Sequence, residues 1–573
     1  MKSLRLRMTA VVAGMVSLGA VLAGCGSSTT VAQSPPTPSA LTIGLATGQN
    51  MNWWPPIQSA TACGNVVGGG GINGPESYMP LLWVNRHDNI NLSRSIASGI
   101  QVSQNDTVFT IHLNSKWHWS NGQPVTASDV AYDADLVLAA AQKSSPLTYC
   151  FTGTGGVPTD WKSVTAEGAH TVVITTTKSV NPIWFEHNGL SQLVPIPKKT
   201  WDRYSNVDQE LHWIQSISDS PSNPVYQVVD GPYRVAQAVH NQHWTYVANP
   251  QYDGSKPKVK KVTYEYEPSA SALLGQLKSG EVAYASLPFS LYQSASDIKG
   301  YHVVHETFLG YSDIAINFRS NAASVGPLLN HLYIRQALQM GIDQASYIQS
   351  MYHGLGVQNY GPVSKEPSNP YYDPTLKNPD PYNPAKGRKL LEAHGWHLVK
   401  GVMEKNGQKL TMPMLYASGS VSFQRIAQVL QQSWAKEGIQ VTLSPKAPQN
   451  LSTIIGTPSD SNQWALAGGL GWGYGPDYYP SGGGLFATNS GYNLGAYHSP
   501  TMNRLIADTY LGGTSAQLKS RFDAYEVYTS QQLPVLWMPN KDDLEIVSNQ
   551  LKGFRQNWNT IQQYVPANRL SFK

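Results

Sequence analysis

The sequence is poor in charged residues. Asp, Glu, Lys and Arg make up 13% of the 573 residues, about half of the share in an ordinary soluble protein. The net charge of +4 is too small for an electrostatic nucleic-acid binder, and the one basic cluster, KPKVKK at 256–261, is short. We interpret this cluster as a solvated strand or turn edge, and we expect no nucleic-acid partner.

The common catalytic motifs are missing as well. No GxSxG, HExxH or P-loop pattern occurs. Gly69, Gly71 and Gly74 satisfy GxGxxG, but PESYMP follows them, where a nucleotide-binding fold needs a helix. His112 and His118 have no cysteine or carboxylate at metal-ligand spacing. The sequence therefore predicts neither a cofactor nor a metal site.

Long apolar runs occur only near the N-terminus, so no later segment is expected to span a membrane. Three cations in the first seven residues precede the apolar run Met8–Val21, and LAGC then ends at Cys25. A transmembrane helix is the alternative, but the run is short and lacks a charged stop. We predict a signal peptide over 1–24. LAGC resembles a bacterial lipobox, which implies that a lipidated Cys25 anchors the protein to the outer face of the cell membrane, the periplasmic side in a Gram-negative cell.

Cysteine is scarce, with three in the chain. If Cys25 carries lipid at the start of a Ser/Thr/Pro-rich flexible tether over 25–39, only Cys63 and Cys150 remain. Two cysteines in an oxidising compartment favour one disulfide, and the alternative is two buried free thiols. Mass measurement with and without reductant distinguishes them, because two alkylatable thiols in the unreduced, denatured protein would exclude the disulfide.

The rest of the chain mixes strand and helix patterns. TVFTIHL alternates as a half-buried strand does, and TASD then opens a helix that runs to about Gln142. Asp129 and Asp133 share one face of that helix, which we predict to be solvated. Later helices are expected over 271–280, 383–395 and 422–438, and the last is followed by the strand IQVTL. Such units build α/β layers, so the predicted fold class is α/β.

Five segments carry a family resemblance. They are WHWSNGQPVTASDVAYDADLVL, DGPYRVAQAVHNQHWTYVANPQYDG, INFRSNAASVGPLLNHLYIRQALQMGIDQASYI, YNPAKGRKLLEAHGW and GAYHSPTMNRLI, in this order along the chain. Together they resemble the signature blocks of the extracellular solute-binding proteins of family 5, which are the oligopeptide-, dipeptide- and nickel-binding lipoproteins of ABC importers. One departure is Asn503, which stands where these relatives usually have Asp.

The resemblance implies a two-lobed fold of the periplasmic-binding-protein type, with an inserted subdomain and a hinge. Lobe I would comprise 40–80, 190–310 and 537–573, the inserted subdomain 81–189, and lobe II 311–536. The implied protein is a monomer without enzyme activity. It closes on a small ligand by hinge motion and passes the ligand to ABC permease subunits.

The loop GWGYGPDYYPSGGGLF at 471–486 holds one acid among aromatic residues. It resembles the W-x-A-D-Y loop of peptide-binding relatives, in which the acid pairs with the peptide's α-ammonium group. The resemblance maps Trp472, Asp477 and Tyr478 onto that motif, although two extra residues separate Trp472 from Asp477. The alternative is that Trp472 belongs to the core and Asp477 forms a turn. The ligand-binding candidates are Trp53, Trp54, Tyr284, Tyr311, Trp472, Tyr474, Asp477 and Tyr478.

The predicted function is capture of an oligopeptide by an importer's binding protein. Aromatic walls also suit sugars, so an oligosaccharide binder of the same family is one alternative. A different class of alternative is a secreted glycan hydrolase with Asp477 as a catalytic carboxylate. Such an enzyme needs a second carboxylate about 5–9.5 Å away, and the nearest acid downstream is Asp508, in a stretch that reads as a helix.

Overall fold

The computed structural model describes residues 40–45, 51, 53–59, 76–150, 152–307, 309–419, 421–474 and 479–573. The chain divides into two units, Met1–Pro35 and Pro36–Lys573, and all described residues belong to the second. The predicted signal peptide and tether lie outside the described residues, as do Cys25, Cys63, Asp477 and Tyr478. Among the described residues, no helix is long and apolar enough to cross a membrane.

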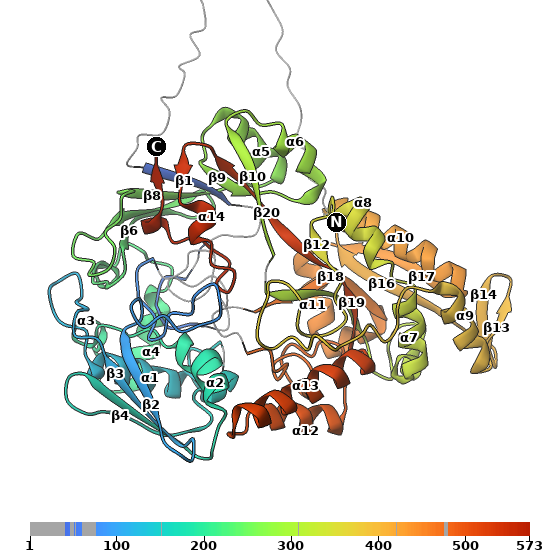
Figure 1. The fold of residues 1–573 in the computed structure, drawn as a ribbon, viewed down its shortest axis with the longest axis horizontal. Coiled ribbons are helices and arrows are strands. Elements are labelled where there is room, and N and C mark those ends of the chain that lie inside the picture. Colours follow the sequence, from blue (N-terminus) through green and yellow to red (C-terminus); the bar gives the residue numbers. More distant parts are fainter. Residues whose placement is uncertain are drawn as a thin grey trace, which may run out of the picture. The chain divides into compact units, whose positions relative to one another are not determined.

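The first sheet has eight strands in the described part of the chain (Figure 1). Seven of them follow the spatial order β10-β20-β9-β1-β8-β7-β6, and β12 pairs with β20. The strands are β1 (Ala40–Leu45), β6 (Tyr233–Val239), β7 (His243–Ala248), β8 (Lys261–Tyr266), β9 (Tyr284–Ser286), β10 (Tyr301–Thr307), β12 (Gly356–Val357) and β20 (Asn540–Ser548). Strand β1 runs parallel to β8 and β9, whereas β20 runs antiparallel to β9 and β10. This sheet therefore joins strands from distant parts of the chain.

One helix on this sheet shows how local signals set its ends. Helix α5 (Ala270–Ser279) begins where the Ser269 hydroxyl accepts a hydrogen bond from the Ala272 amide, at 3.1 Å. It ends at Gly280, whose φ of 80° favours glycine. Leu273 and Leu277 of this helix pack against β9 and β20 in a small apolar cluster. The predicted helix over 271–280 is thus confirmed.

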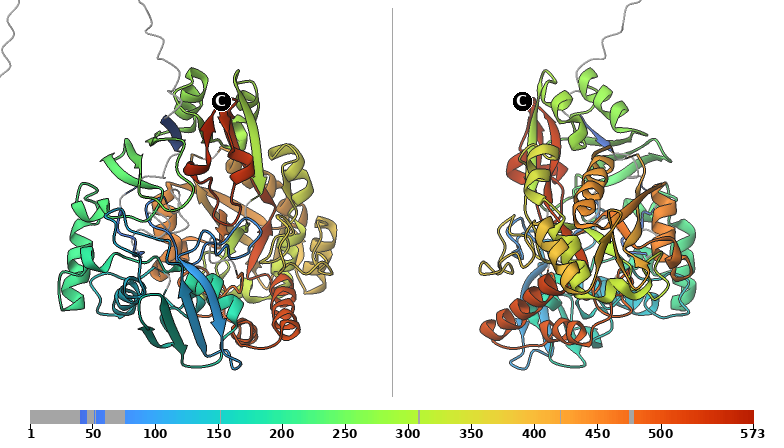
Figure 2. Two further views of the ribbon diagram at one scale, coloured as in Figure 1. Left: turned by 60° about the vertical axis from the view of Figure 1, so that its left-hand side comes forward. Right: turned by 90° about the vertical axis from the view of Figure 1, so that its right-hand side faces the viewer.

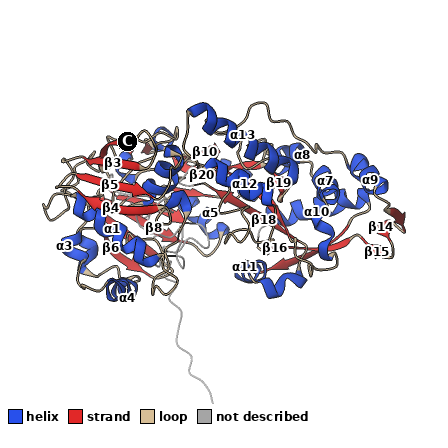
Figure 3. Ribbon diagram, turned by 90° about the horizontal axis from the view of Figure 1, so that it is seen from below, coloured by secondary structure: helices blue, strands red, loops and turns tan. Residues whose placement is uncertain are grey.

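The second sheet has the order β17-β16-β18-β11-β19. Its strands are β11 (Gly310–Ile316), β16 (Thr411–Ala417), β17 (Gln440–Lys446), β18 (Leu466–Gly473) and β19 (Val535–Met538). Side-chain alternation along β16 gives the sheet two buried faces, because Met412 and Met414 belong to the main core and Leu415 to a separate cluster. Helix α10 (Val421–Glu437) covers the first face and α11 (Pro448–Gly456) the second (Figure 3).

The third sheet is antiparallel, with the order β2-β3-β5-β4. Its strands are β2 (Ala97–Val102), β3 (Val108–Leu113), β4 (Trp161–Ala166) and β5 (Thr171–Thr176), and α1 (Ala127–Ala140) packs beside it. Phe109, Ile111 and Leu113 are buried on one face, as the alternating pattern predicts. The predicted strand is confirmed, and so is the predicted helix that follows it.

The prediction of a solvated acidic face on α1 is wrong. Asp129 and Asp133 are both buried. One Asp129 oxygen accepts the Thr126 amide at 2.8 Å, which caps the helix, and the other accepts the Lys198 amide at 2.9 Å. Asp133 accepts the Val194 amide at 3.2 Å, and burial raises the pKa of its carboxyl well above the usual range. The segment 194–198 covers this helix face, and it supplies amide donors to both acids.

Two of the places where the chain passes between the first and second sheets are adjacent. Strand β10 ends at Thr307 and β11 begins at Gly310, while β19 ends at Met538 and β20 begins at Asn540. Strands β10 and β20 lie side by side in the first sheet (Figures 1 and 2). Strands β11 and β19 are neighbours in the second sheet. The segment that forms the second sheet therefore leaves and rejoins the first sheet at neighbouring points.

The remaining helices and strands complete these layers. They are α2 (Pro182–Trp184), α3 (Lys198–Trp201), α4 (Val207–Ile217), α6 (Tyr292–Ser296), α7 (Leu332–Met340), α8 (Gln344–Met351), α9 (Pro384–Ala393), α12 (Pro500–Thr509), α13 (Ser515–Gln532), α14 (Phe554–Asn557), β13 (His397–Val399), β14 (Val402–Lys405), β15 (Gln408–Lys409), β21 (Leu551–Lys552) and β22 (Ser571–Phe572).

Candidate ligand-binding site

A cavity of about 700 Å³ lies between two segments far apart in the sequence, 150–188 and 472–510. We call it the larger cavity, because a smaller one adjoins it. This volume is within the range of small-ligand sites. Six aromatic side chains contribute to its lining, namely Trp184, Trp472, Tyr474, Tyr479, Tyr492 and Tyr510. Gly482, Gly483 and Gly484 also line it and have no side chain to cover their peptide groups. No described residue in this lining carries a formal charge at neutral pH.

Direct contacts join the two walls of the larger cavity. Asn181 donates its backbone amide to the Tyr510 carbonyl at 2.7 Å and its side-chain amide to the Thr509 carbonyl at 2.9 Å. The Asn188 side chain donates to the Tyr479 carbonyl at 2.8 Å. The Trp184 and Tyr510 rings stack with centroids 4.1 Å apart. Hydrogen bonds and ring stacking thus hold segment 181–188 against segment 479–510.

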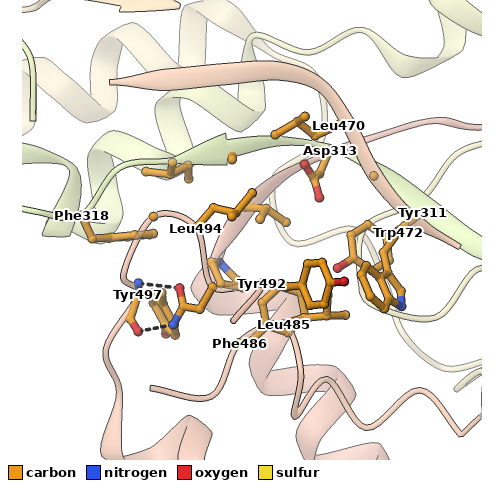
Figure 4. A pocket seen from close by; sticks show the side chains of 17 residues that line it. Tyr311, Asp313, Phe318, Leu470, Trp472, Leu485, Phe486, Tyr492, Leu494 and Tyr497 are labelled. Atoms are coloured by element: carbon orange, nitrogen blue, oxygen red, sulfur yellow. Dashed lines mark hydrogen bonds between the residues drawn. The ribbon is translucent and has the colours of Figure 1, made fainter. Parts of the chain in front are cut away.

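A second cavity, which we call the aromatic pocket, is drawn in Figure 4. It adjoins the first, because the two share lining residues. Its volume is about 120 Å³. Strands β11 and β18 and the loop 485–497 supply most of its lining, which includes Tyr311, Asp313, Phe318, Leu470, Trp472, Phe486, Tyr492, Leu494 and Tyr497. Trp472 and Tyr492 line both cavities, and their ring centroids are 4.6 Å apart. These two rings therefore stand between the larger cavity and the aromatic pocket.

The local structure of the pocket follows from strand pairing. Tyr311 pairs with Trp472 and Asp313 with Leu470 across β11 and β18, so these four residues face the same side of the sheet. The Tyr311 ring makes edge-on contacts with two other rings. Its centroid lies 6.2 Å from that of Tyr474 and 5.2 Å from that of Trp537. Burial, followed by the neighbouring Tyr474 and Asp313, raises the pKa of the Tyr311 phenol well above its usual value. This phenol is neutral at physiological pH.

A third cavity, of about 300 Å³, lies at the chain crossings between the first and second sheets. Asp313 lines it too, together with Lys541, Asp542 and Asp543. Asp542 accepts hydrogen bonds from His305 at 2.9 Å and from the Thr307 hydroxyl at 2.6 Å. Asp542 therefore has its partners on the neighbouring strand β10. Asp543 pairs instead with the ammonium group of Lys541 on its own strand, at 3.7 Å.

The structure brings three of the candidate residues together. Trp472 and Tyr474 line the larger cavity, and Tyr311 and Trp472 line the aromatic pocket. Asp477 and Tyr478 lie outside the described residues, but Tyr474 and Tyr479 on either side of them both line the larger cavity. Trp472 is partly buried and packs against the main apolar core, so its role in ligand binding stays a prediction.

The other candidates lie elsewhere. Trp53 and Trp54 are buried in the core, where the Trp53 indole donates to the Ile57 carbonyl at 2.9 Å and Trp54 packs on Tyr246. Tyr284 is partly buried on β9 and meets Phe554 edge-on at 4.8 Å. These three line none of the three cavities described above. A role for them in ligand binding stays a prediction.

Several lining residues were not predicted. Trp184, Tyr479, Tyr492, Tyr510 and Asp313 come from four separate segments, and only tertiary contacts bring them together. Tyr479 lies in the aromatic loop that the sequence singled out, so the loop's composition was a usable signal for that residue. Cys150, which also lines the larger cavity, is disulfide-bonded, and its pairing with Cys63 stays a prediction. The described residues contain no group of three or more His, Cys, Asp or Glu that could hold a metal ion.

Comparison with known proteins assigns the family. The sequence model of the bacterial extracellular solute-binding proteins, family 5, matches residues 91–493. The oligopeptide-binding protein OppA of Lactococcus lactis strain IL1403 is 25% identical over 429 residues, covering 70% of this chain and 68% of that protein. The nickel-binding periplasmic protein of Escherichia coli is 28% identical over 220 residues, covering 37% of this chain and 40% of that protein.

Solved structures show the same fold. The Bacillus subtilis oligopeptide-binding protein AppA, in complex with a nonapeptide, has a TM-score of 0.73 at 19% identity and covers 94% of this chain and 100% of that one. NikZ from Campylobacter jejuni, in complex with Ni(L-His), has a TM-score of 0.75 at 17% identity and covers 93% and 100%. The predicted α/β fold of the periplasmic-binding-protein type is confirmed. The chain belongs to the bacterial extracellular solute-binding proteins of family 5, the non-catalytic substrate-binding proteins of ABC importers.

Proposed function

We propose that this protein captures an oligopeptide in the larger cavity and delivers it to the permease of an ABC importer. The observation that carries the proposal is that Tyr474 and Tyr479, on either side of Asp477, both line this cavity. A carboxylate in that loop can pair with a peptide's α-ammonium group, while aromatic rings exclude water and supply contact area. We therefore assign the ammonium contact to Asp477 and wall positions to Trp472, Tyr474 and Tyr478.

The rest of the lining supports a ligand of variable sequence. A site that accepts many peptides uses main-chain hydrogen bonds and adaptable space for side chains. The glycine run at 482–484 exposes main-chain groups, and the described lining carries no charge that would select one side chain. Relatives point the same way, because OppA of Lactococcus lactis is an oligopeptide-binding protein and AppA of Bacillus subtilis was solved with a nonapeptide.

We further propose that the lobes close on the ligand about the two chain crossings. Lobe I would comprise 40–80, 190–310 and 537–573, the inserted subdomain 81–189 and lobe II 311–536. The sheets support this division, because the first sheet is built mostly from lobe I, the second from lobe II and the third from the inserted subdomain. The hydrogen bonds between segments 181–188 and 479–510 would form on closure.

The proposed setting is the outer face of the cell membrane. The signal-peptide pattern over 1–24 and LAGC at its end support a lipid anchor on Cys25, and the proposed protein acts as a monomer. Such an anchor keeps the binding protein close to permease subunits in the same membrane, which raises their effective concentration for each other.

A peptide pair tests the ammonium contact. Asp477→Asn should weaken a peptide with a free N-terminus far more than its N-acetylated form, because only the first offers a charge to the carboxylate. A hydrogen bond to a charged group contributes about 1.5–3 kcal/mol, or roughly 10- to 150-fold in Kd. Asp508→Asn is the matched control, since Asp508 pairs with Arg504 on α12 and lines neither cavity. The Kd of each peptide is measured by calorimetry. An equal loss of affinity for the free and the N-acetylated peptide in Asp477→Asn would contradict the assignment.

An oligosaccharide is the second candidate ligand. Aromatic rings stack on sugar faces, and six of them line the larger cavity. Binding of a neutral oligosaccharide with no detectable peptide binding would favour this candidate. The other alternative, a glycan hydrolase with Asp477 as a catalytic carboxylate, is wrong, because the chain belongs to a family of non-enzymatic transport proteins.

A further inference from the structure

Asp313 is an acid inside an apolar cavity. Its side chain lies on the same face of β11 as Tyr311, and Figure 4 shows the carboxylate pointing into the aromatic pocket. The residue is only 8% exposed. It is the one residue with an ionisable carboxylate, ammonium or guanidinium group among the described residues that line the aromatic pocket or the larger cavity.

The carboxylate has no partner within the described part of the chain. Its Oδ1 accepts no hydrogen bond, and none of the described cations forms an ion pair with it. Burial raises the pKa of Asp313 to about 7. An apolar side chain of similar size would avoid this desolvation cost, and because Asp313 lines a cavity, a ligand group there can supply the missing partner.

The walls of the pocket are suited to a cation. Six aromatic rings surround the space that Asp313 faces, and aromatic faces attract ammonium and guanidinium groups. These rings belong to Tyr311, Phe318, Trp472, Phe486, Tyr492 and Tyr497. An anion would be repelled by the carboxylate, and a neutral apolar group would leave the carboxylate without a partner. A cation satisfies both the acid and the rings.

A ligand in the larger cavity can reach this pocket. Trp472 and Tyr492 form the shared wall, and Tyr492 is 49% exposed, so rotating its ring away from Trp472 would open the wall without disturbing the core. The volume of about 120 Å³ is several times what one water molecule needs. A short flexible chain with a terminal charge therefore fits, whereas a bulky ring system does not.

We propose that the aromatic pocket is a subsite for a cationic side chain of the ligand, in which Asp313 pairs with the ammonium or guanidinium group of a lysine or arginine residue. This assignment rests on the proposed peptide function. It makes the protein selective for basic peptides, in addition to any contact at the peptide's N-terminus.

The test compares peptides that differ only in charge. Each peptide of a short alanine-based series carries lysine at one position and is matched by norleucine at that position. The wild-type protein should bind the best lysine peptide about tenfold or more tightly than its norleucine match. Asp313→Asn should abolish this preference and leave the norleucine peptide's Kd within about twofold. A preference that survives in Asp313→Asn overturns the proposal.

Two further variants locate the cation. Asp542→Asn removes an acid of the third cavity, and the lysine preference should be unchanged. If Asp542→Asn loses the lysine preference and Asp313→Asn keeps it, the cation binds in the third cavity and the proposal is overturned. Tyr492→Ala shortens an exposed side chain at the pocket's mouth and should reduce the preference severalfold, which keeps the proposal testable if Asp313→Asn fails to fold.

A small probe separates this inference from the proposed function. n-Butylammonium should raise the melting temperature of the wild-type protein but not of Asp313→Asn, while 1-butanol should have no such effect. If no peptide binds but n-butylammonium stabilises only the wild type, the peptide function fails and the subsite stands. If neither the probe nor any lysine peptide distinguishes the two proteins, the subsite is overturned.

The pH dependence gives an independent readout. A bound cation favours the charged form of Asp313, so the lysine preference should fall by about tenfold or more from pH 8 to pH 5.5. The other titratable groups that line these two cavities with Asp313 are the phenols of Tyr311, Tyr492 and Tyr497 in the aromatic pocket and, in the third cavity, Tyr352, Lys541, Asp542 and Asp543. Because they remain in Asp313→Asn, a similar pH dependence of that variant would assign the effect to them and overturn the role of Asp313.

Discussion

Asn181 joins the two walls of the larger cavity through one fully buried side chain, and its replacement gives a measurable prediction. Its Oδ1 caps α2 by accepting the Ile183 amide at 3.0 Å, while its Nδ2 donates to the Thr509 carbonyl on the opposite wall at 2.9 Å. Asn181→Ala removes both functions. Loss of the cap costs about 0.5–2 kcal/mol, and the unpaired, buried Thr509 carbonyl costs about 1–3 kcal/mol.

The second loss acts between the walls. It should shift the equilibrium toward separated walls by about 1–3 kcal/mol, which is roughly 5- to 150-fold. The backbone amide of residue 181 reports this equilibrium directly, because it donates to the Tyr510 carbonyl across the walls. In native-state hydrogen exchange, this amide should therefore exchange about 5- to 150-fold faster in Asn181→Ala than in the wild type.

Two variants separate the cap from the bridge. Asn206→Ala removes a cap of the same kind, since Asn206 accepts the Gln209 amide at 3.0 Å at the start of α4 and lines neither wall among the described residues. It should destabilise the protein by about 0.5–2 kcal/mol without changing exchange at residue 181. Asn181→Asp keeps the cap oxygen but not the donor, so it should speed exchange as Asn181→Ala does. Equal exchange in Asn181→Ala and the wild type would refute the bridge.

Two more predictions concern stability and location. Glu437 is fully buried, burial raises its pKa to about 9, and neither oxygen has a hydrogen-bond partner among the described residues. The folded state therefore keeps a proton that the unfolded state releases, so this group should lower the free energy of unfolding by up to about 1.4 kcal/mol per pH unit as the pH rises from 5.5 to 8.5. Glu437→Gln should flatten that slope in urea titrations, and an unchanged slope would show that other groups set it. Cys25→Ala should move the protein from the membrane fraction to the supernatant of the producing cells, and retention in the membrane would argue against a lipid anchor at Cys25.

Local patterns predicted the secondary structure well. Alternation placed Phe109, Ile111 and Leu113 on one face of β3, and caps located the ends of α1, α5 and α9. Each of these signals acts within a few residues of the chain, so no tertiary information is needed to read it. The expectation of a solvated face for Asp129 and Asp133 is wrong because it needed tertiary information. The segment 194–198, which covers that face, lies more than 60 residues away along the chain.

The candidate site was predictable only in part. The composition of the loop 471–486 identified Trp472 and Tyr474, because large aromatics among glycines are unusual outside a binding surface. Asp313 offered no such signal, since an acid on a strand is usually exposed, and its burial depends on the neighbouring strands β18 and β19. Trp53 and Trp54 show the opposite case. The sequence is equally compatible with a core and a pocket position for adjacent tryptophans, and the structure buries both in the core.

The place of β20 in the first sheet has a consequence for biosynthesis. Strand β20 lies between β9 and β10, yet it follows β10 by roughly 230 residues along the chain. At about 5–20 residues per second, a ribosome needs roughly 10–50 s to make that stretch. Until then β9 and β10 each present an unpaired edge, which is a template for aggregation. The nascent chain therefore depends on chaperones or on an unfolded export state for longer than its local helices and hairpins would suggest.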